Sequence, residues 1–273
     1  MNDSNTSIAF IGGGNMASAI IGGLLKQGLP PAQVAVVEPF SEARTRLKQQ
    51  FGVDAREQAS PQLAGAGLVV WAVKPQTFKD AAAQVRPHAQ QALHLSVAAG
   101  IRSDSIAAWL GTERIVRSMP NTPALVGKGM TALFARAAVS AADRSRVEQV
   151  IATTGESLWV EREQHLDAVT ALSGSGPAYV FYFLEAMTQA GSEMGLSPEQ
   201  ARRLAVGTFA GASELARASS EPLHVLRERV TSKGGTTYAA ITSMEADHVK
   251  SAFMRALHAA SKRAEELGDE FGK

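Results

Sequence analysis

The sequence predicts an α/β protein in which a doubly wound parallel sheet is followed by an all-helical C-terminal part. Short apolar runs alternate with amphipathic segments through the first half, and the first run ends in a glycine-rich turn. Strand-like runs nearly vanish after residue 163. Because continuous apolar strands separated by helices are typical of a parallel sheet covered on both faces, we expect two domains, 1–163 and 164–273.

Seven apolar runs are the predicted strands, and the last two extend the sheet: Ile8–Ile11, Val34–Val37, Leu68–Val73, Leu93–Val97, Ile115–Met119, Gly129–Phe134 and Ser157–Val160. The segments between them predict these helices: Ser18–Lys26, Glu42–Gln50, Gln76–Val85, Ser105–Leu110 and Ala141–Ala152. The second half predicts five more: Leu166–Leu172, Pro177–Met194, Pro198–Ala218, Pro222–Val230 and Tyr238–Leu267. Ser197 before Pro198 supplies a capping hydroxyl and a first-turn proline, which is a strong helix start.

Composition excludes several classes of function. A net charge of +1 argues against a general nucleic-acid binder. The chain has no cysteine, so disulfides, thiolate zinc sites and a cysteine nucleophile are ruled out. The six histidines are scattered without close ligand spacing, so they are expected to be structural or surface residues and no metal is expected. Residues 1–7 lack the basic and apolar regions of a secretory signal, and no apolar run approaches the roughly 20 residues that cross a bilayer, which predicts a cytoplasmic protein without a membrane partner.

The first strand leads directly into Gly12-Gly13-Gly14-Asn15-Met16-Ala17. In a dinucleotide-binding motif Gly12 permits the tight turn, Gly14 lets the backbone approach a pyrophosphate, and Ala17 lets the helix lie close to the strand. Taken alone, such a string also fits an ordinary strand-to-helix turn. Its place at the head of a β/α series predicts a Rossmann-type domain. The cofactor-binding residues expected here are Ile11, Gly12, Gly14, Asn15, Met16 and Ala17.

Glu38 ends the second strand, where an acidic side chain normally accepts hydrogen bonds from the adenosine ribose and repels a 2′-phosphate. This favours NADH. Ser41, Arg44 and Arg46 follow closely and offer partners for the phosphate of NADPH, although the arginines also fit a solvated helix face. The choice between NADH and NADPH stays open.

Three further loops follow predicted strands, at the edge where doubly wound sheets bind ligands. Small residues there would let a flat nicotinamide ring lie against backbone, and Asn121 and Thr122 offer polar groups to its carboxamide or to water. Turn chemistry alone is the alternative for any single loop. Lys74 suits a general acid, a phosphate contact or a solvated loop residue. The cofactor-binding residues expected in these loops are Ala72, Val73, Lys74, Pro75, Val97, Ala98, Ala99 and Asn121.

Two segments of the second half, residues 171–179 (ALSGSGPAY) and 230–241 (VTSKGGTTYAAI), together with the VKPQ and MPNTP loops, closely resemble pyrroline-5-carboxylate reductases. The resemblance spans nearly the whole chain. It implies reduction of 1-pyrroline-5-carboxylate to proline by hydride from NADPH or NADH, the last step of proline biosynthesis. It also implies a homodimer formed through the helical domain, larger rings that are commonly decamers, and a substrate site between one subunit's nicotinamide and the partner's 232–237 loop.

The residues of that loop suit such a substrate. Consecutive backbone N–H groups in a glycine-rich loop before a helix form an anion nest, so Gly235, Thr236 and Thr237 suit a carboxylate with the Ser232 hydroxyl nearby. By the resemblance, Thr237 meets the ring nitrogen and is the catalytic candidate. The alternative from spacing alone is an ordinary helix start with a hydroxyl cap.

The resemblance also places Glu163 and Arg229 near substrate or cofactor, while surface charge at an element boundary is the other interpretation of both. One departure concerns the adenosine pocket, where some family members have Asn and this chain has Arg56-Glu57-Gln58-Ala59.

Two rival functions differ from this one. A β-hydroxyacid-type dehydrogenase also joins a Rossmann domain to a helical one, but Lys233 and Lys250 lie in no motif that suggests its catalytic lysine. A nicotinamide-sensing regulator would need no substrate nest, and the intact 232–237 loop argues against it.

Overall fold

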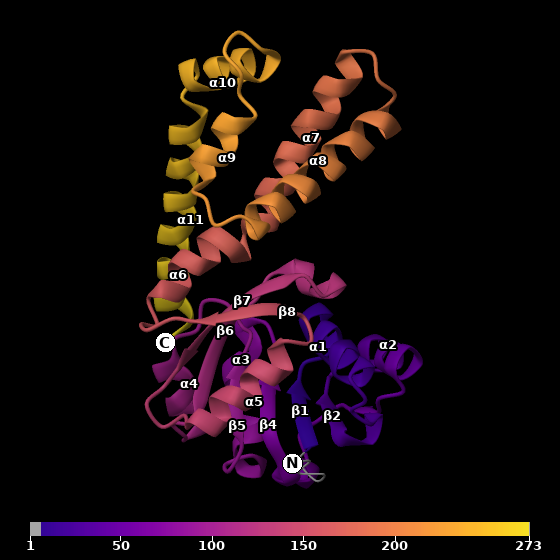
Figure 1. Ribbon diagram of the computed structural model, residues 1–273. Coiled ribbons are helices and arrows are strands. Elements are labelled where there is room, and N and C mark those ends of the chain that lie inside the picture. The colour runs from indigo at the N-terminus through magenta and orange to yellow at the C-terminus, as the bar shows by residue number, and fades with distance from the viewer. Residues whose placement is uncertain (1–6, 273) are drawn as a thin grey trace. The chain divides into compact units, whose positions relative to one another are not determined.

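The computed structural model describes residues 7–272 (Figure 1). Within them an eight-stranded sheet has the order β3-β2-β1-β4-β5-β6-β7-β8. The expectation about a signal segment concerns residues that lie almost entirely outside this range. The strands are β1 (Ser7–Ile11), β2 (Val34–Val37), β3 (Ala55–Arg56), β4 (Ala66–Trp71), β5 (Leu93–Ser96), β6 (Ile115–Met119), β7 (Gly129–Ala135) and β8 (Gly155–Trp159).

The predicted parallel sheet is confirmed for the first six strands, which pair in parallel. Strand β7 is instead antiparallel to β6, and β8 runs parallel to β7. Only a short loop with the turn η4 (Thr122–Val126) joins β6 to β7, and a parallel crossover needs a dozen or more residues. The sheet is therefore mixed at this edge.

Helices cover both faces of the sheet. Alternate residues of β1 enter two separate apolar clusters, Ile8 and Phe10 on one face and Ala9 and Ile11 on the other. This alternation confirms the doubly wound arrangement. The elements around the sheet are α1 (Asn15–Lys26), η1 (Pro31–Gln33), α2 (Ser41–Phe51), η2 (Pro61–Gly65), α3 (Pro75–Val85), η3 (Arg86–His88), α4 (Ser103–Leu110), α5 (Ala141–Ile151), α6 (His165–Val169) and the π-turn η5 (Thr170–Gly174).

The all-helical second part is also confirmed. Its helices are α7 (Gly176–Glu193), α8 (Pro198–Ala218), α9 (Leu223–Arg229), α10 (Thr236–Ala246) and α11 (Val249–Phe271). Helices α7 and α8 lie side by side as a hairpin (Figure 1). Ser197 caps α8 as expected, because its hydroxyl accepts a hydrogen bond from the Gln200 N–H at 3.2 Å.

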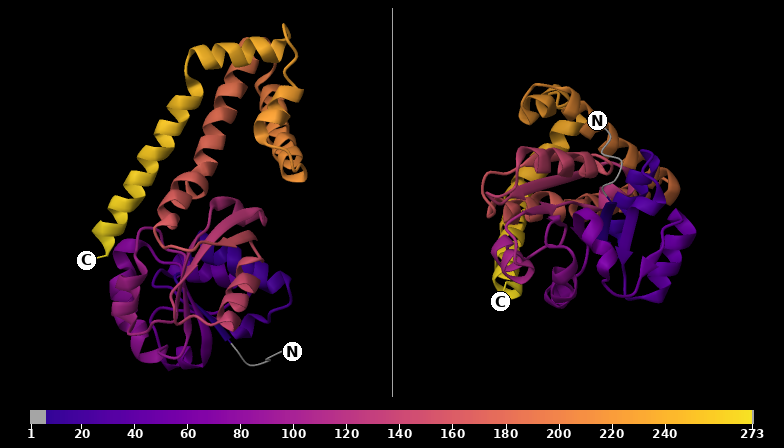
Figure 2. Two further views of the ribbon diagram at one scale, coloured as in Figure 1. Left: turned by 60° about the vertical axis from the view of Figure 1, so that its left-hand side comes forward. Right: turned by 90° about the horizontal axis from the view of Figure 1, so that it is seen from below.

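The single predicted helix Tyr238–Leu267 is wrong. The chain turns between α10 and α11, where His248 has a φ of +54°, and only α11 continues as a long rod (Figure 2). A positive φ at a non-glycine residue breaks the helical hydrogen-bond pattern locally. The apolar spacing continues across this turn, which is why periodicity alone did not reveal it.

Two compact units make up the chain, and their division differs from the predicted one at residue 163. The first unit contains the residues through Ser175 and the end of α11 from Ala260, and the second contains Gly176–Ala259. Leu166 and Ala171 are buried, so the segment after residue 163 packs within the first unit. Among the described residues, no helix has both the length and the apolar character needed to cross a bilayer.

Candidate functional site

The glycine turn after β1 has a geometry that only glycine fits at its first position. Gly12 has a φ of +96°, and a Cβ there would lie 2.5 Å from the carbonyl oxygen of Ala72. Its N–H donates to the carbonyl of Val37 at 2.8 Å. Gly12 therefore lets three strand ends approach one another at a sharp turn.

The N-terminus of α1 is open to a ligand. Gly14 is the N-cap, no side chain caps the helix, and no acidic residue lies in its first turn. A Cβ on Gly14 would meet no atom within 4 Å, whereas Ala17 behind it is fully buried. Unpaired first-turn N–H groups and the positive end of the helix dipole suit a phosphate anion. This end of α1 fits the pyrophosphate of a dinucleotide.

The structure brings the predicted cofactor loops together at one edge of the sheet. The Ala72 N–H donates to Ile11 at 2.8 Å, and the Val97 N–H donates to Trp71 at 3.0 Å. Val73 and Lys74 follow β4 and Ala98 follows β5, while Pro75 opens α3. The strand order reverses between β2 and β4 on either side of β1, and doubly wound sheets bind their ligands at such a point.

Glu38 is held at the end of β2 with only 6% of its surface exposed. Its carboxylate accepts hydrogen bonds from the N–H groups of Gly13 at 2.7 Å and Phe40 at 2.9 Å. The side chain therefore fixes the glycine turn as well as standing at the position expected for a ribose contact.

Asn121 is occupied by protein groups. Its amide nitrogen donates to the carbonyl and hydroxyl of Ser173 at 3.2 and 3.3 Å, and its amide oxygen accepts from the Met130 N–H at 2.9 Å. Asn121 thus joins the loop after β6 to β7 and to the SGSG segment. Its predicted contact with a nicotinamide stays a prediction.

Glu163 lies in a network that sequence reasoning missed. Its carboxylate accepts from Arg117 at 2.6 Å and from both the N–H and the hydroxyl of Ser103 at 2.6 Å each. Burial lowers the pKa of the Arg117 guanidinium, and Glu163 opposes that shift. Nearby, Arg102 forms an ion pair with Asp167 at 2.8 Å. These contacts anchor the loop before α6, and a substrate role for Glu163 stays a prediction.

One sequence signal pointed to this network. Arg117 stands in the middle of the apolar run Ile115–Met119, where a buried charge needs a partner. Its partner is 46 residues away, so no spacing rule identifies Glu163.

The 232–237 loop forms the start of α10 in the second unit. Gly235 is the N-cap without a side-chain cap, and Gly234 before it has a φ of +75°. The Ser232 hydroxyl lies over Gly235, where a Cβ would be 2.7 Å from its oxygen. Thr236 and Thr237 occupy the first turn and are exposed. The Gly235 N–H donates to the Ser232 carbonyl at 3.0 Å, so the predicted nest loses this donor. The N–H groups of Thr236 and Thr237 remain open and suit a carboxylate.

Arg229 is turned to another partner. Its guanidinium forms a two-pronged ion pair with Glu221, with N–O distances of 2.5 and 2.6 Å. This pair ties the end of α9 to the segment before that helix. The predicted substrate contact of Arg229 stays a prediction.

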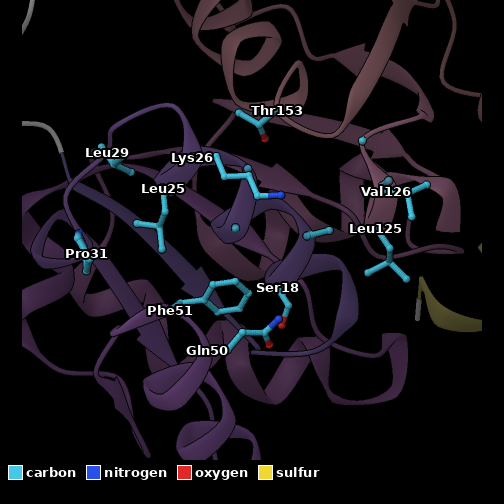
Figure 3. A pocket seen from close by; sticks show the side chains of 15 residues that line it. Ser18, Leu25, Lys26, Leu29, Pro31, Gln50, Phe51, Leu125, Val126 and Thr153 are labelled. Atoms are coloured by element: carbon cyan, nitrogen blue, oxygen red, sulfur yellow. The ribbon is translucent and has the colours of Figure 1, made fainter.

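A separate hollow of about 890 Å³ lies on the outer side of α1 (Figure 3). The Phe51 end of α2, the turn η4 and Thr153 complete its walls. It contains none of the predicted coenzyme residues, and Lys26 is the single charged side chain in its lining. The glycine turn lies outside this hollow, with Gly12 and Gly13 buried and Gly14 exposed.

The fold and the glycine turn define a Rossmann-type dinucleotide-binding protein with a helical C-terminal part. A family model described as pyrroline-5-carboxylate reductase dimerisation matches residues 163–267, and one described as NADP oxidoreductase, coenzyme F420-dependent, matches residues 7–100. The pyrroline-5-carboxylate reductase of Pseudomonas aeruginosa is 45% identical over 99% of this chain and 100% of its own length. That of Haemophilus influenzae is 40% identical over 95% and 97%. The chain belongs to the pyrroline-5-carboxylate reductase family.

Solved structures agree with this assignment. A pyrroline-5-carboxylate reductase from Coxiella burnetii superposes with a TM-score of 0.89 at 36% identity, covering 96% of this chain and 98% of that one. The Plasmodium falciparum pyrroline carboxylate reductase, solved with NADP bound, gives 0.86 at 28% identity, with 97% and 98% covered.

Proposed function

We propose that this chain reduces 1-pyrroline-5-carboxylate to proline with hydride from NADH or NADPH, the last step of proline biosynthesis. Full-length similarity to curated pyrroline-5-carboxylate reductases is the observation that carries the proposal. The open start of α1 supports it, because it fits the pyrophosphate of either coenzyme. A bound nicotinamide coenzyme supplies the hydride, and the chain's own groups bind and orient the two reactants.

The substrate carboxylate is proposed to bind at the start of α10. The N–H groups of Thr236 and Thr237 are available there and the Ser232 hydroxyl lies over the same turn, whereas the Gly235 N–H donates to the Ser232 carbonyl at 3.0 Å. Charge-assisted hydrogen bonds from backbone N–H groups to a carboxylate are short and directional. They would fix the orientation of a small cyclic imino acid.

Thr237 is the proposed catalytic contact. A protonated cyclic imine is already an electrophile, so the reaction needs neither a metal nor a covalent nucleophile. The protein has to hold the imine carbon against the hydride donor and exclude water. The Thr237 hydroxyl is proposed to hydrogen-bond the ring nitrogen as it becomes an amine, while Glu163 and Arg229 shape the surroundings.

Homo-oligomerisation is proposed to complete the site. The matched dimerisation family model covers the segment that contains the 232–237 loop. The second unit also exposes large apolar side chains, including Phe181 at 58% and Tyr182 at 70%, which a partner copy would cover. We propose a cytoplasmic homodimer that assembles further into a decameric ring, with the loop of one subunit serving its partner's nicotinamide.

The test is an assay of purified protein with the pyrroline substrate and each coenzyme, with proline as the measured product. Thr237→Ala should lower kcat about 100- to 1,000-fold, the usual range for one transition-state hydrogen bond, and leave coenzyme affinity nearly unchanged. Thr242→Ala makes the same change in the same helix and should retain activity.

The outcomes separate the alternatives. No proline with either coenzyme would overturn the proposal, and turnover of a β-hydroxyacid instead would support the other reductase class. Equal losses of turnover and coenzyme affinity in Thr237→Ala would remove Thr237 from the substrate site. Sedimentation or light scattering would report the size of the assembly.

A further inference from the structure

The hollow beside α1 has two walls that pack directly against the helix. A Cβ on Gly22 would lie 3.0 Å from the ring of Phe51, at the end of α2. A Cβ on Gly23 would lie 2.6 Å from the Cβ of Thr153, in the loop after α5. Two consecutive glycines in a helix interior lower helix stability, and here they let both neighbours approach α1 closely. These walls of the hollow are therefore preformed.

The hollow is elongated and carries apolar side chains at its rim. Its lining follows α1 from Ser18 to Lys26, a stretch that at about 1.5 Å per residue spans about 12 Å. Leu125 and Val126 of η4 lie on one side of the hollow and Phe51 lies on the other (Figure 3). Leu125 and Val126 are 55% and 76% exposed. The volume of about 890 Å³ is within the range of small-molecule sites. Such a surface suits a flexible hydrocarbon chain.

Lys26 gives the lining a single positive charge. It lies in the last turn of α1, and its ammonium end is turned toward the middle of the lining residues (Figure 3). No carboxylate lines the hollow, and within residues 7–272 none forms an ion pair with Lys26. The remaining polar side chains of the lining, those of Ser18, Gln50 and Thr153, are neutral. An anion with an apolar tail therefore complements this surface in both charge and polarity.

We infer that this hollow binds an apolar monocarboxylate, such as a medium-chain fatty acid, at a site separate from those of coenzyme and substrate. The carboxylate lies against Lys26, and the hydrocarbon chain lies along α1 between Phe51 and η4. None of the residues expected to bind the coenzyme lines the hollow, and the 232–237 loop belongs to the other unit. The inference does not depend on the proposed activity.

The test is binding of straight-chain carboxylates to the purified full-length protein, measured by calorimetry. The affinities for hexanoate, octanoate and decanoate should rise about tenfold for each two added methylenes, because every methylene removed from water adds to the binding free energy. Saturating NADH, NADPH or proline should leave octanoate binding in place, since the site is separate.

Variants of the lining test the charge and the space independently. Lys26→Met should lower octanoate affinity about two- to fivefold, the usual contribution of an exposed ion pair, and should not weaken binding of octan-1-ol. Lys48→Met is its control, because Lys48 is exposed on α2, pairs with Asp54 at 2.8 Å and lies outside the hollow. Ala19→Leu enlarges a lining side chain and should lower the affinity for both ligands at least about tenfold. Ala83→Leu, on the exposed side of α3, should leave both affinities unchanged.

The inference is overturned if none of the three carboxylates binds, which is the result expected if a second copy of the chain covers Leu125 and Val126. Displacement of octanoate by coenzyme or by proline would place its carboxylate in the proposed active site and also overturn the inference. So would an octanoate affinity that Lys26→Met or Ala19→Leu leaves unchanged, or that the matched control lowers equally. None of these measurements involves proline formation, so their failure is distinct from failure of the proposed function.

Discussion

Replacing Glu163 should destabilise the protein through the charge that it leaves behind. Glu163 pairs with Arg117 at 2.6 Å, and their side chains are only 14% and 6% exposed. Removing one partner of a buried pair strands the other charge, which typically costs 3–5 kcal/mol. In Glu163→Gln the amide oxygen can still accept a hydrogen bond from Ser103. We therefore expect a loss of free energy of unfolding at the lower end of that range, about 3 kcal/mol.

Urea unfolding of Glu163→Gln, Arg117→Met and the double variant tests this, at one fixed protein concentration because the assembly affects stability. The double variant should lose clearly less free energy of unfolding than the sum of the losses in the two single variants, since it removes both charges. Glu266→Gln breaks a surface pair with Arg263 at 3.3 Å and should leave stability nearly unchanged.

Near-wild-type stability of Glu163→Gln, or strict additivity in the double variant, would refute this reasoning. The same proteins also test the predicted substrate role. If Glu163 contacts substrate, the KM of the Glu163→Gln enzyme for the pyrroline should exceed that of the wild type even at low temperature, where the variant is fully folded. An unchanged KM would make Glu163 an anchoring residue only.

The remaining predictions concern the core and the turns. Burial lowers the pKa of His94 from its usual 6.5 to about 4, so the folded state binds fewer protons than the unfolded one in that window. The contribution of neutral His94 to the free energy of unfolding should be fully present above pH 6.5 and fall by about 3 kcal/mol as the pH drops toward 4. In His94→Gln, urea titrations should show a flatter dependence of stability on pH. Gly155→Ala should cost at least about 2 kcal/mol, because Gly155 has a φ of +146° and a Cβ would lie 2.1 Å from the Gly129 carbonyl oxygen. Gly65→Ala is its control, since a Cβ there meets nothing within 4 Å, and equal melting temperatures for the two variants would contradict the steric argument. Gly12→Ala should lower the affinity for NADH and for NADPH alike in binding titrations, and a loss of affinity for only one of them would contradict the role given to the turn.

Element boundaries followed from the sequence wherever local chemistry set them. Pro198 after Ser197 fixed the start of α8 to the residue, and the predicted run Val34–Val37 is β2 without change. The helix after the glycine turn begins at Asn15, whereas the sequence predicted a start at Ser18. The prediction missed the first turn because that turn has no apolar periodicity. The turn at His248 was missed for a similar reason, since alanine-rich spacing continues through it.

Part of the candidate site could be predicted and part could not. Gly12 and Gly14 were identifiable because a tight turn and a bare helix start restrict residue type locally. The partners of Glu38, Asn121 and Glu163 were not identifiable. Each side chain contacts groups far along the chain, such as the 52 residues between Asn121 and Ser173.

The sequence by itself determined the alternating β/α order, the dinucleotide turn and the family, because short-range sterics and apolar periodicity act within a few residues. Only the tertiary structure decided that β7 runs against β6, that Glu38 is fixed by the turn it faces, and that Glu163 neutralises Arg117. Buried polar groups take whichever partner the packing of distant strands places beside them, and burial then makes that partner obligatory.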